Sequence, residues 1–255
     1  MKIFIIGLVM IILTDRALHG QVINIESERI KTDTTGWAGS AEIGTHIYKN
    51  NFVLYDISSN IHVQYKTKKS LFLLLNNISF ISVDNPGSED TPFENAGFQH
   101  FRYNYKITDK FVWEAFVQGQ YNEALGIDWR FLAGTGPRYK VIGSDKFRLY
   151  VAALYMFERE KNPEFTDAIN VNRMSSYVSF TIAPNDKFNL VSTTYYQPAL
   201  SDFSDYRISS VTNLKIYLSK RFYWKSDYNI LFDTAPAEGI DPTVYSFNNG
   251  VGLEF

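Results

Sequence analysis

The 255-residue sequence contains no cysteine, and this absence excludes disulfides, thiolate metal sites and cysteine nucleophiles. It also excludes lipid attachment through an N-terminal cysteine. Charge of neither sign is in excess, since 25 Lys and Arg stand against 27 Asp and Glu. The composition therefore predicts no strongly basic face of the kind that binds nucleic acid.

Long hydrophobic runs are also scarce. Residues 3–13 form an unbroken apolar run after Met1 and Lys2, which is typical of a secretory signal peptide. The alternative is an N-terminal anchor helix. We expect a signal peptide over 1–20, with cleavage after Gly20. No later segment approaches the roughly 18 apolar residues that a spanning helix needs, so the mature chain is not expected to cross a membrane as a helix.

Aromatic residues are abundant, at 16% of the chain, and the mature sequence alternates between apolar and polar residues almost throughout. This period of two predicts β-strands. Most are about 10 to 14 residues long, enough for a tilted strand to span a bilayer. The twelve predicted strands are 37–48, 53–67, 71–83, 96–107, 111–122, 128–141, 147–157, 173–182, 188–197, 206–219, 222–232 and 243–255.

The connections between these strands alternate between tight turns and mostly longer loops, as in an up-and-down outer-membrane barrel. The proposed external loops hold 14 Asp and Glu against 3 Lys and Arg, a net charge of −11. The periplasmic turn windows hold 11 Lys and Arg against 3 Asp, a net charge of +8. The contrast supports opposite sides for the two kinds of connection.

Aromatic side chains cluster on the apolar face near both strand ends, for example Trp113 and Trp224 at one end and Trp129 at the other. Two such girdles are expected at the two interfaces of a membrane. A soluble lipocalin-like barrel or sandwich is the alternative. The terminal Phe255 resembles the signal by which the barrel-assembly machinery recognises outer-membrane barrels, so we expect that machinery as a partner.

These patterns predict an all-β fold, a closed 12-stranded antiparallel up-and-down transmembrane β-barrel in the bacterial outer membrane. Closure is expected because lipid cannot satisfy an open sheet edge. The barrel should span 36–255, with both ends on the periplasmic side. Segment 21–35 is expected to be a loose periplasmic lead or partial plug.

Several short stretches of the mature chain follow a familiar order, at 36–44, 95–105, 130–138, 154–158, 173–177, 195–198 and 205–207. Taken in this order, they resemble the outer-membrane family called domain of unknown function 481, the salt-induced outer-membrane protein group. The resemblance implies an outer-membrane barrel with no established biochemical activity.

The sequence gives little sign of catalytic chemistry. Its mature part has three histidines, and none is followed two positions later by the serine of the His-x-Ser pattern found in 12-stranded outer-membrane phospholipases. No metal-ligand spacing, phosphate loop or nucleophile elbow appears. We therefore expect no enzyme, no cofactor and no metal. The three histidines are His46, His62 and His100.

The polar strand faces carry charges that we expect to line the barrel lumen. Arg102 should lie diagonally beside Glu114 across a tight turn, and Asp128 should share a face with Arg130. Charges paired in this way predict a small-conductance pore or one closed at rest. The alternative is that they hold a plugged barrel together. The predicted lumen charges are Glu42, Asp56, Arg102, Glu114, Asp128, Arg130, Arg138, Arg173, Arg207 and Asp227.

The resulting functional hypothesis is a narrow passive channel or envelope protein, in contact with outer-membrane lipids and with other envelope proteins as candidate partners. Two alternatives belong to other classes. One is an outer-membrane lipid hydrolase, against which the missing His-x-Ser argues. The other is a surface receptor or adhesin that works through the acidic external loops.

Overall fold

The computed structural model describes residues 35–49, 52–84, 91–164 and 166–253, so the predicted signal peptide, most of the lead segment and Phe255 lie outside the described residues. The described chain consists of strands and one short 3-10 helix, η1, over Glu123–Leu125. The strands are β1 Gly36–Lys49, β2 Val53–Lys66, β3 Ser70–Asp84, β4 Thr91–Lys106, β5 Phe111–Asn122, β6 Ile127–Gly143, β7 Phe147–Lys161, β8 Ile169–Asn185, β9 Phe188–Pro198, β10 Tyr206–Tyr217, β11 Phe222–Asp233 and β12 Thr243–Leu253.

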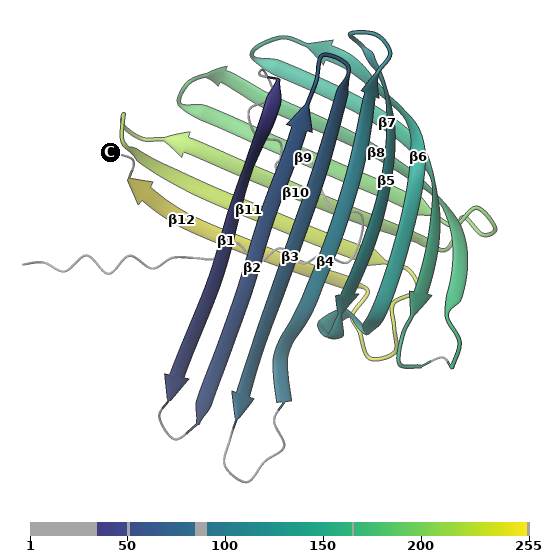
Figure 1. Cartoon of the computed structure of the whole chain (residues 1–255). Coiled ribbons are helices and arrows are strands. Elements are labelled where there is room, and N and C mark those ends of the chain that lie inside the picture. Colours follow the sequence, from purple (N-terminus) through teal and green to yellow (C-terminus); the bar gives the residue numbers. More distant parts are fainter. Residues whose placement is uncertain (1–34, 50–51, 85–90, 165, 254–255) are drawn as a thin grey trace, which may run out of the picture.

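All twelve strands belong to one antiparallel sheet in which each strand pairs with its neighbours in sequence, in the order β1 to β12. This confirms the predicted all-β, up-and-down order. Figure 1 shows the sheet curling around a common interior, with β1 and β12 as its two edges. Among the ladders of the described residues none joins β1 to β12, so the closing pair stays a prediction.

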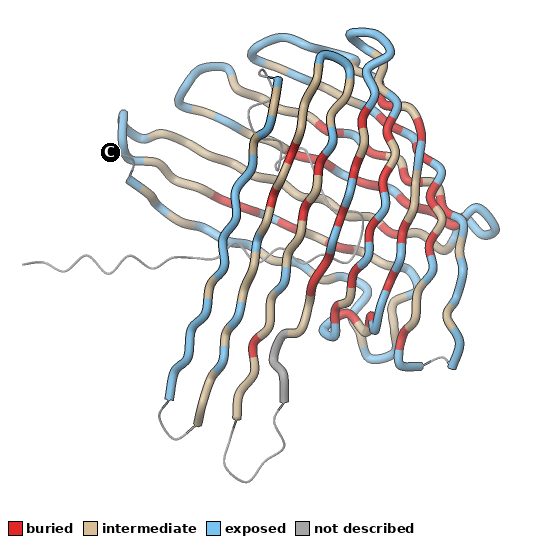
Figure 2. The backbone as a smooth tube through the Cα atoms, viewed as in Figure 1, coloured by how far each residue is buried: buried red, intermediate tan, exposed pale blue. Residues whose placement is uncertain are grey.

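Burial follows the alternation of the strands, but with the polar face inside. Figure 2 shows buried and exposed residues alternating along the central strands. Glu114 and His100 are 0% exposed, whereas Trp113 is 43% exposed. A soluble sandwich or barrel would bury its apolar face and expose its polar one. The observed arrangement is the one that a lipid-facing surface requires.

Aromatic rings on the outer face form a chain near the tight-turn ends of β1 to β4. Trp37, Tyr65, Phe72, Tyr103 and Tyr105 follow one another with ring centroids 4.8 to 6.5 Å apart. The chain places amphipathic rings side by side at one level across neighbouring strands. This is the arrangement predicted for a girdle at a membrane interface.

The tight turns are closed by short local bonds. In the turn between β4 and β5, the Thr108 hydroxyl accepts from the Phe111 amide at 3.0 Å. Lys106 Nζ lies 2.5 Å from Asp109, and this hydrogen bond and the lysine charge hold the pKa of the Asp109 carboxyl below its usual value.

In the part of the chain that the structure describes, no helix is long and apolar enough to cross a membrane.

Candidate functional site

Glu114 of β5 is the centre of an ionic cluster on the inner face, in the half near the tight turns. Its Oε2 lies 3.1 Å from Arg102 Nη1 of β4, and its Oε1 lies 3.7 Å from Arg138 Nη1 of β6. The Tyr177 hydroxyl of β8 donates to Oε2 at 2.7 Å. The cluster therefore joins four strands through one buried carboxylate. Because β5 and β8 are three strands apart, the Tyr177 bond crosses part of the interior.

A chain of hydrogen bonds extends this cluster along β4 and β5. Arg102 Nε donates to His100 Nε2 at 3.3 Å, so the His100 Nδ1–H donates to Gln118 Oε1 at 2.8 Å. Gln118 in turn donates to Gln120. The His100 ring also stacks on Phe116, with centroids 5.6 Å apart. Both nitrogens of His100 are thus engaged in holding its neighbours.

A second ionic cluster lies nearer the long-loop end. Its alternating charges run from Arg130 to Glu160 at 2.5 Å, and from Arg207 to Glu158 at 2.8 Å and to Asp233 at 2.6 Å. Arg173 closes the series, 3.4 Å from Glu158 and 3.0 Å from Asp205. The cluster links strands from β6 to β11. Its bonds satisfy every arginine in it with at least one carboxylate.

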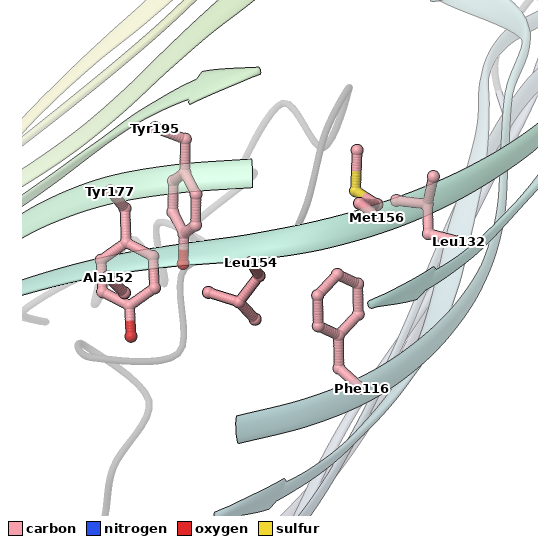
Figure 3. Packing of buried hydrophobic residues seen from close by; sticks show 7 residues of the cluster. All are labelled: Phe116, Leu132, Ala152, Leu154, Met156, Tyr177 and Tyr195. Carbon is pink, nitrogen blue, oxygen red and sulfur yellow. The ribbon is translucent and has the colours of Figure 1, made fainter. Parts of the chain in front are cut away.

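An apolar layer separates the two ionic clusters along the strands. On β5 the layer begins with Phe116, two residues after Glu114, and on β7 it ends with Met156, two residues before Glu158. Figure 3 shows the side chains of this layer gathered between the strands. An apolar constriction disfavours water and ions in a narrow passage. The layer consists of Phe116, Leu132, Ala152, Leu154, Met156, Tyr177 and Tyr195.

A further apolar contact joins opposite sides of the barrel at the long-loop mouth. The side chain of Asn122 accepts from the Leu125 amide and so caps η1. Leu125 and Ile127 then pack against Leu231 of β11, with Val244 of β12 beside them. Because β5 and β11 are six strands apart, this contact spans the mouth. We call these four residues the mouth contact.

The structure brings together only some of the predicted lumen charges. Arg102 and Glu114 pair as predicted from the hairpin register, in which Asn104 lies opposite Glu114. Asp227 accepts from Asn213 at 2.6 Å and lies 2.9 Å from Lys225. Glu42 on β1 is exposed, and Asp56 on β2 is half-buried.

The prediction that Asp128 shares the inner face with Arg130 is wrong. The β5–β6 ladder shifts its register between Gln120 and Asn122, so three residues of β6 advance against two of β5. This bulge breaks the alternation on which the prediction depended. Asp128 is therefore exposed, while Arg130 is buried and bonded to Glu160.

Sequence reasoning missed the acidic half of the second cluster. Glu158 and Glu160 were expected in an external loop, but β7 continues to Lys161. A usable signal was present in the sequence. Leu154 and Met156 point inward at a spacing of two residues, and the same spacing continues to Glu158 and Glu160.

The described residues contain no group of three or more His, Asp or Glu that could hold a metal ion.

Comparisons with known proteins show the family of this chain. The model of the family described as "Protein of unknown function, DUF481" matches residues 41–255. A search of curated proteins finds no match. Among solved structures, the NanC porin is 11% identical, with a TM-score of 0.48 over 86% of this chain and 100% of that one.

Two other solved structures share this general likeness. The translocator domain of the autotransporter NalP from Neisseria meningitidis is 11% identical, with a TM-score of 0.40 over 90% of this chain and 92% of that one. A mutant of the TodX monoaromatic hydrocarbon channel is 9% identical, with a TM-score of 0.38 over 84% of this chain and 78% of that one.

Proposed function

The chain belongs to the DUF481 family of proteins of unknown function. We propose that it is an outer-membrane barrel acting as a narrow passive channel, closed at rest. The observation that carries this proposal is the inverted burial, with Glu114 and Arg102 inside and large apolar side chains outside. A polar interior with an apolar exterior suits a water-accessible passage through lipid.

Three features of the interior support a resting state without free conduction. Every arginine of the two ionic clusters lies within ion-pair distance of a carboxylate, and the charges balance over the two clusters together, so little net charge is left to attract a permeating ion. The apolar layer between the clusters resists wetting. The mouth contact joins η1 and β6 to β11 across the long-loop end. Opening would require at least one of these features to rearrange.

Single-channel recording in planar bilayers tests the proposal. The wild-type protein should give rare or small openings. Glu114→Gln leaves Arg102 and Arg138 without their shared carboxylate, so its openings should be larger and more selective for anions. Glu42→Gln, on the exposed inner face of β1, is the matched control and should behave as wild type.

Two outcomes would contradict the proposal. A large ohmic conductance that Glu114→Gln leaves unchanged would refute a lumen governed by paired charges. Silence of both the wild type and Glu114→Gln would instead favour a plugged barrel with a structural role.

We also propose that the protein is not an enzyme. His100 uses both ring nitrogens in hydrogen bonds to Arg102 and Gln118, which supports a positioning role rather than that of a general base. Hydrolysis of phospholipid or lipid A by refolded protein in detergent micelles, abolished in His100→Ala, would overturn this proposal.

A further inference from the structure

Few cationic side chains of the described strands point outward. Alternation along the ladders places Lys49 of β1 and both Arg159 and Lys161 of β7 on the outer face. The other Lys and Arg of the described strands, of which Arg102 and Lys215 are examples, fall on the inner face. Two of the three outward cations therefore stand two residues apart, at the long-loop end of β7.

The surroundings of this pair are aromatic and polar. Arg159 lies opposite Phe131 of β6, and Lys161 lies opposite Trp129. The Arg159 guanidinium carbon is 5.8 Å from the centre of the Trp129 ring. On the β8 side, the Tyr155 hydroxyl donates to Asn172 Oδ1 at 2.5 Å. We call Trp129, Phe131, Tyr155, Arg159, Lys161 and Asn172 the rim patch.

Arg159 differs from the interior arginines in its partners. Among the residues that the structure describes, no carboxylate lies within ion-pair distance of Arg159, whereas Arg130 and Arg207 are each bonded to carboxylates. The acids that flank Arg159 on β7, Glu158 and Glu160, turn inward to those arginines. The rim patch therefore presents positive charge outward from an otherwise acidic side of the molecule.

We propose that the rim patch binds a phosphorylated glycolipid of the outer leaflet, of the lipid A class. This inference rests on the proposed outer-membrane placement, in which the long loops face outward. Phosphate oxygens would accept from Arg159 and Lys161, which supply charge-assisted donors. The Asn172 amide and Tyr155 hydroxyl suit sugar hydroxyls, and the exposed rings of Trp129 and Phe131 suit acyl chains.

The choice of lipid follows from position and chemistry. The phospholipids of the inner leaflet lie at the tight-turn end, away from the patch. A ligand at the long-loop end that carries phosphate, sugar hydroxyls and acyl chains matches all three kinds of side chain in the patch.

The test measures binding of bisphosphorylated lipid A to the refolded full chain in mixed micelles. Arg159→Gln combined with Lys161→Gln removes both charges while keeping polar side chains at both positions, and should weaken binding about five- to tenfold. Lys49→Gln removes the third outward cation, which stands alone on β1, and should leave binding unchanged. Arg159→Lys keeps the positive charge but replaces the planar guanidinium with an ammonium group, and should weaken binding to an intermediate extent.

Binding measurements with other ligands identify which chemical groups of the lipid are recognised. Dephosphorylated lipid A and phosphatidylglycerol should both bind more weakly than the bisphosphorylated form. Inorganic pyrophosphate should compete only weakly, because it lacks the sugar and the acyl chains. Equal binding of phosphatidylglycerol, or full competition by pyrophosphate, would overturn the assignment of a glycolipid site.

Two outcomes separate this inference from the proposed function. If the double glutamine variant binds lipid A as tightly as wild type, while its heat-modifiable migration in gels shows a folded barrel, the rim patch is refuted and the outer-membrane proposal stands. Recovery of the wild-type chain as a soluble protein without detergent would refute the placement on which both rest.

Discussion

Glu114 is the single residue on which the ionic cluster near the tight turns depends. It is fully buried and is shared by Arg102, Arg138 and Tyr177. Removing one partner of a buried ion pair is costly because the remaining charge stays desolvated. At this scale, stability should respond sharply to substitutions that leave the backbone untouched.

Glu114→Gln should lower the free energy of unfolding by about 3 kcal/mol, because two arginines lose their counter-charge. Denaturant titration in detergent, followed by the loss of heat-modifiable migration, measures the change. Glu42→Gln on the exposed face of β1 should cost less than about 0.5 kcal/mol. Equal effects of the two substitutions would show that Glu114 is not the centre of a stabilising cluster.

Tyr177→Phe removes only the hydroxyl that donates to Glu114 at 2.7 Å. A hydrogen bond to a charged group is worth about 1.5 to 3 kcal/mol, so the loss should fall in that range. In the background of Glu114→Gln the same substitution should cost less, and a double-mutant cycle of unfolding free energies measures the difference. Full additivity would argue against the bond.

At the scale of elements, the strands were largely predictable, whereas interior partners from strands that are not adjacent were not. Period-two alternation located all twelve strands, because one face of each is mostly apolar. The end of β7 was misplaced, since Glu158 and Glu160 look like loop residues until Arg130 and Arg207 are known to face them. The alternation of apolar and polar residues in the sequence gives no sign of the bulge in β6. Partners far apart in sequence depend on curvature that no local pattern encodes.

At the same scale, we expect the mouth contact to limit how often the channel opens. Leu125→Asp would place a charge among Ile127, Leu231 and Val244, so the contact should open and channel openings should become more frequent. Leu200→Asp, at an exposed leucine in another loop, is the matched control. Planar-bilayer recordings of both variants check this expectation. An opening frequency for Leu125→Asp equal to that of wild type would mean that the mouth contact does not limit conduction.

The whole molecule has two edges whose outer side chains are the most exposed of the sheet. Trp37 on β1 is 75% exposed and Val251 on β12 is 67% exposed, against 43% for Trp113 in the middle of the sheet. Strands without a neighbour on one side leave backbone groups unsatisfied, and this is untenable in lipid. Pairing of β1 with β12 is the remaining step that would remove both edges.

Cysteine cross-linking tests this pairing on a chain that has no cysteine of its own. A cysteine at Ile43 should form a disulfide with one at an odd position of β12, such as Asn249 or Val251, because these residues share the outer face. Cysteine at the even position Asn248 should react poorly. Absence of cross-linking at every position of β12 would show that the sheet stays open.

The interior bonds also set an order of events during assembly. Every backbone ladder joins strands that are consecutive in sequence, whereas Tyr177 and Glu114 are 63 positions apart, and Arg207 and Glu158 are 49 apart. Hairpins can therefore form one after another while these side chains are still hydrated. The ion pairs to Arg207 mature only after β10 has joined the growing sheet. They therefore form late and cooperatively. A barrel whose assembly stops before β10 lacks them, whereas a fully assembled barrel contains them.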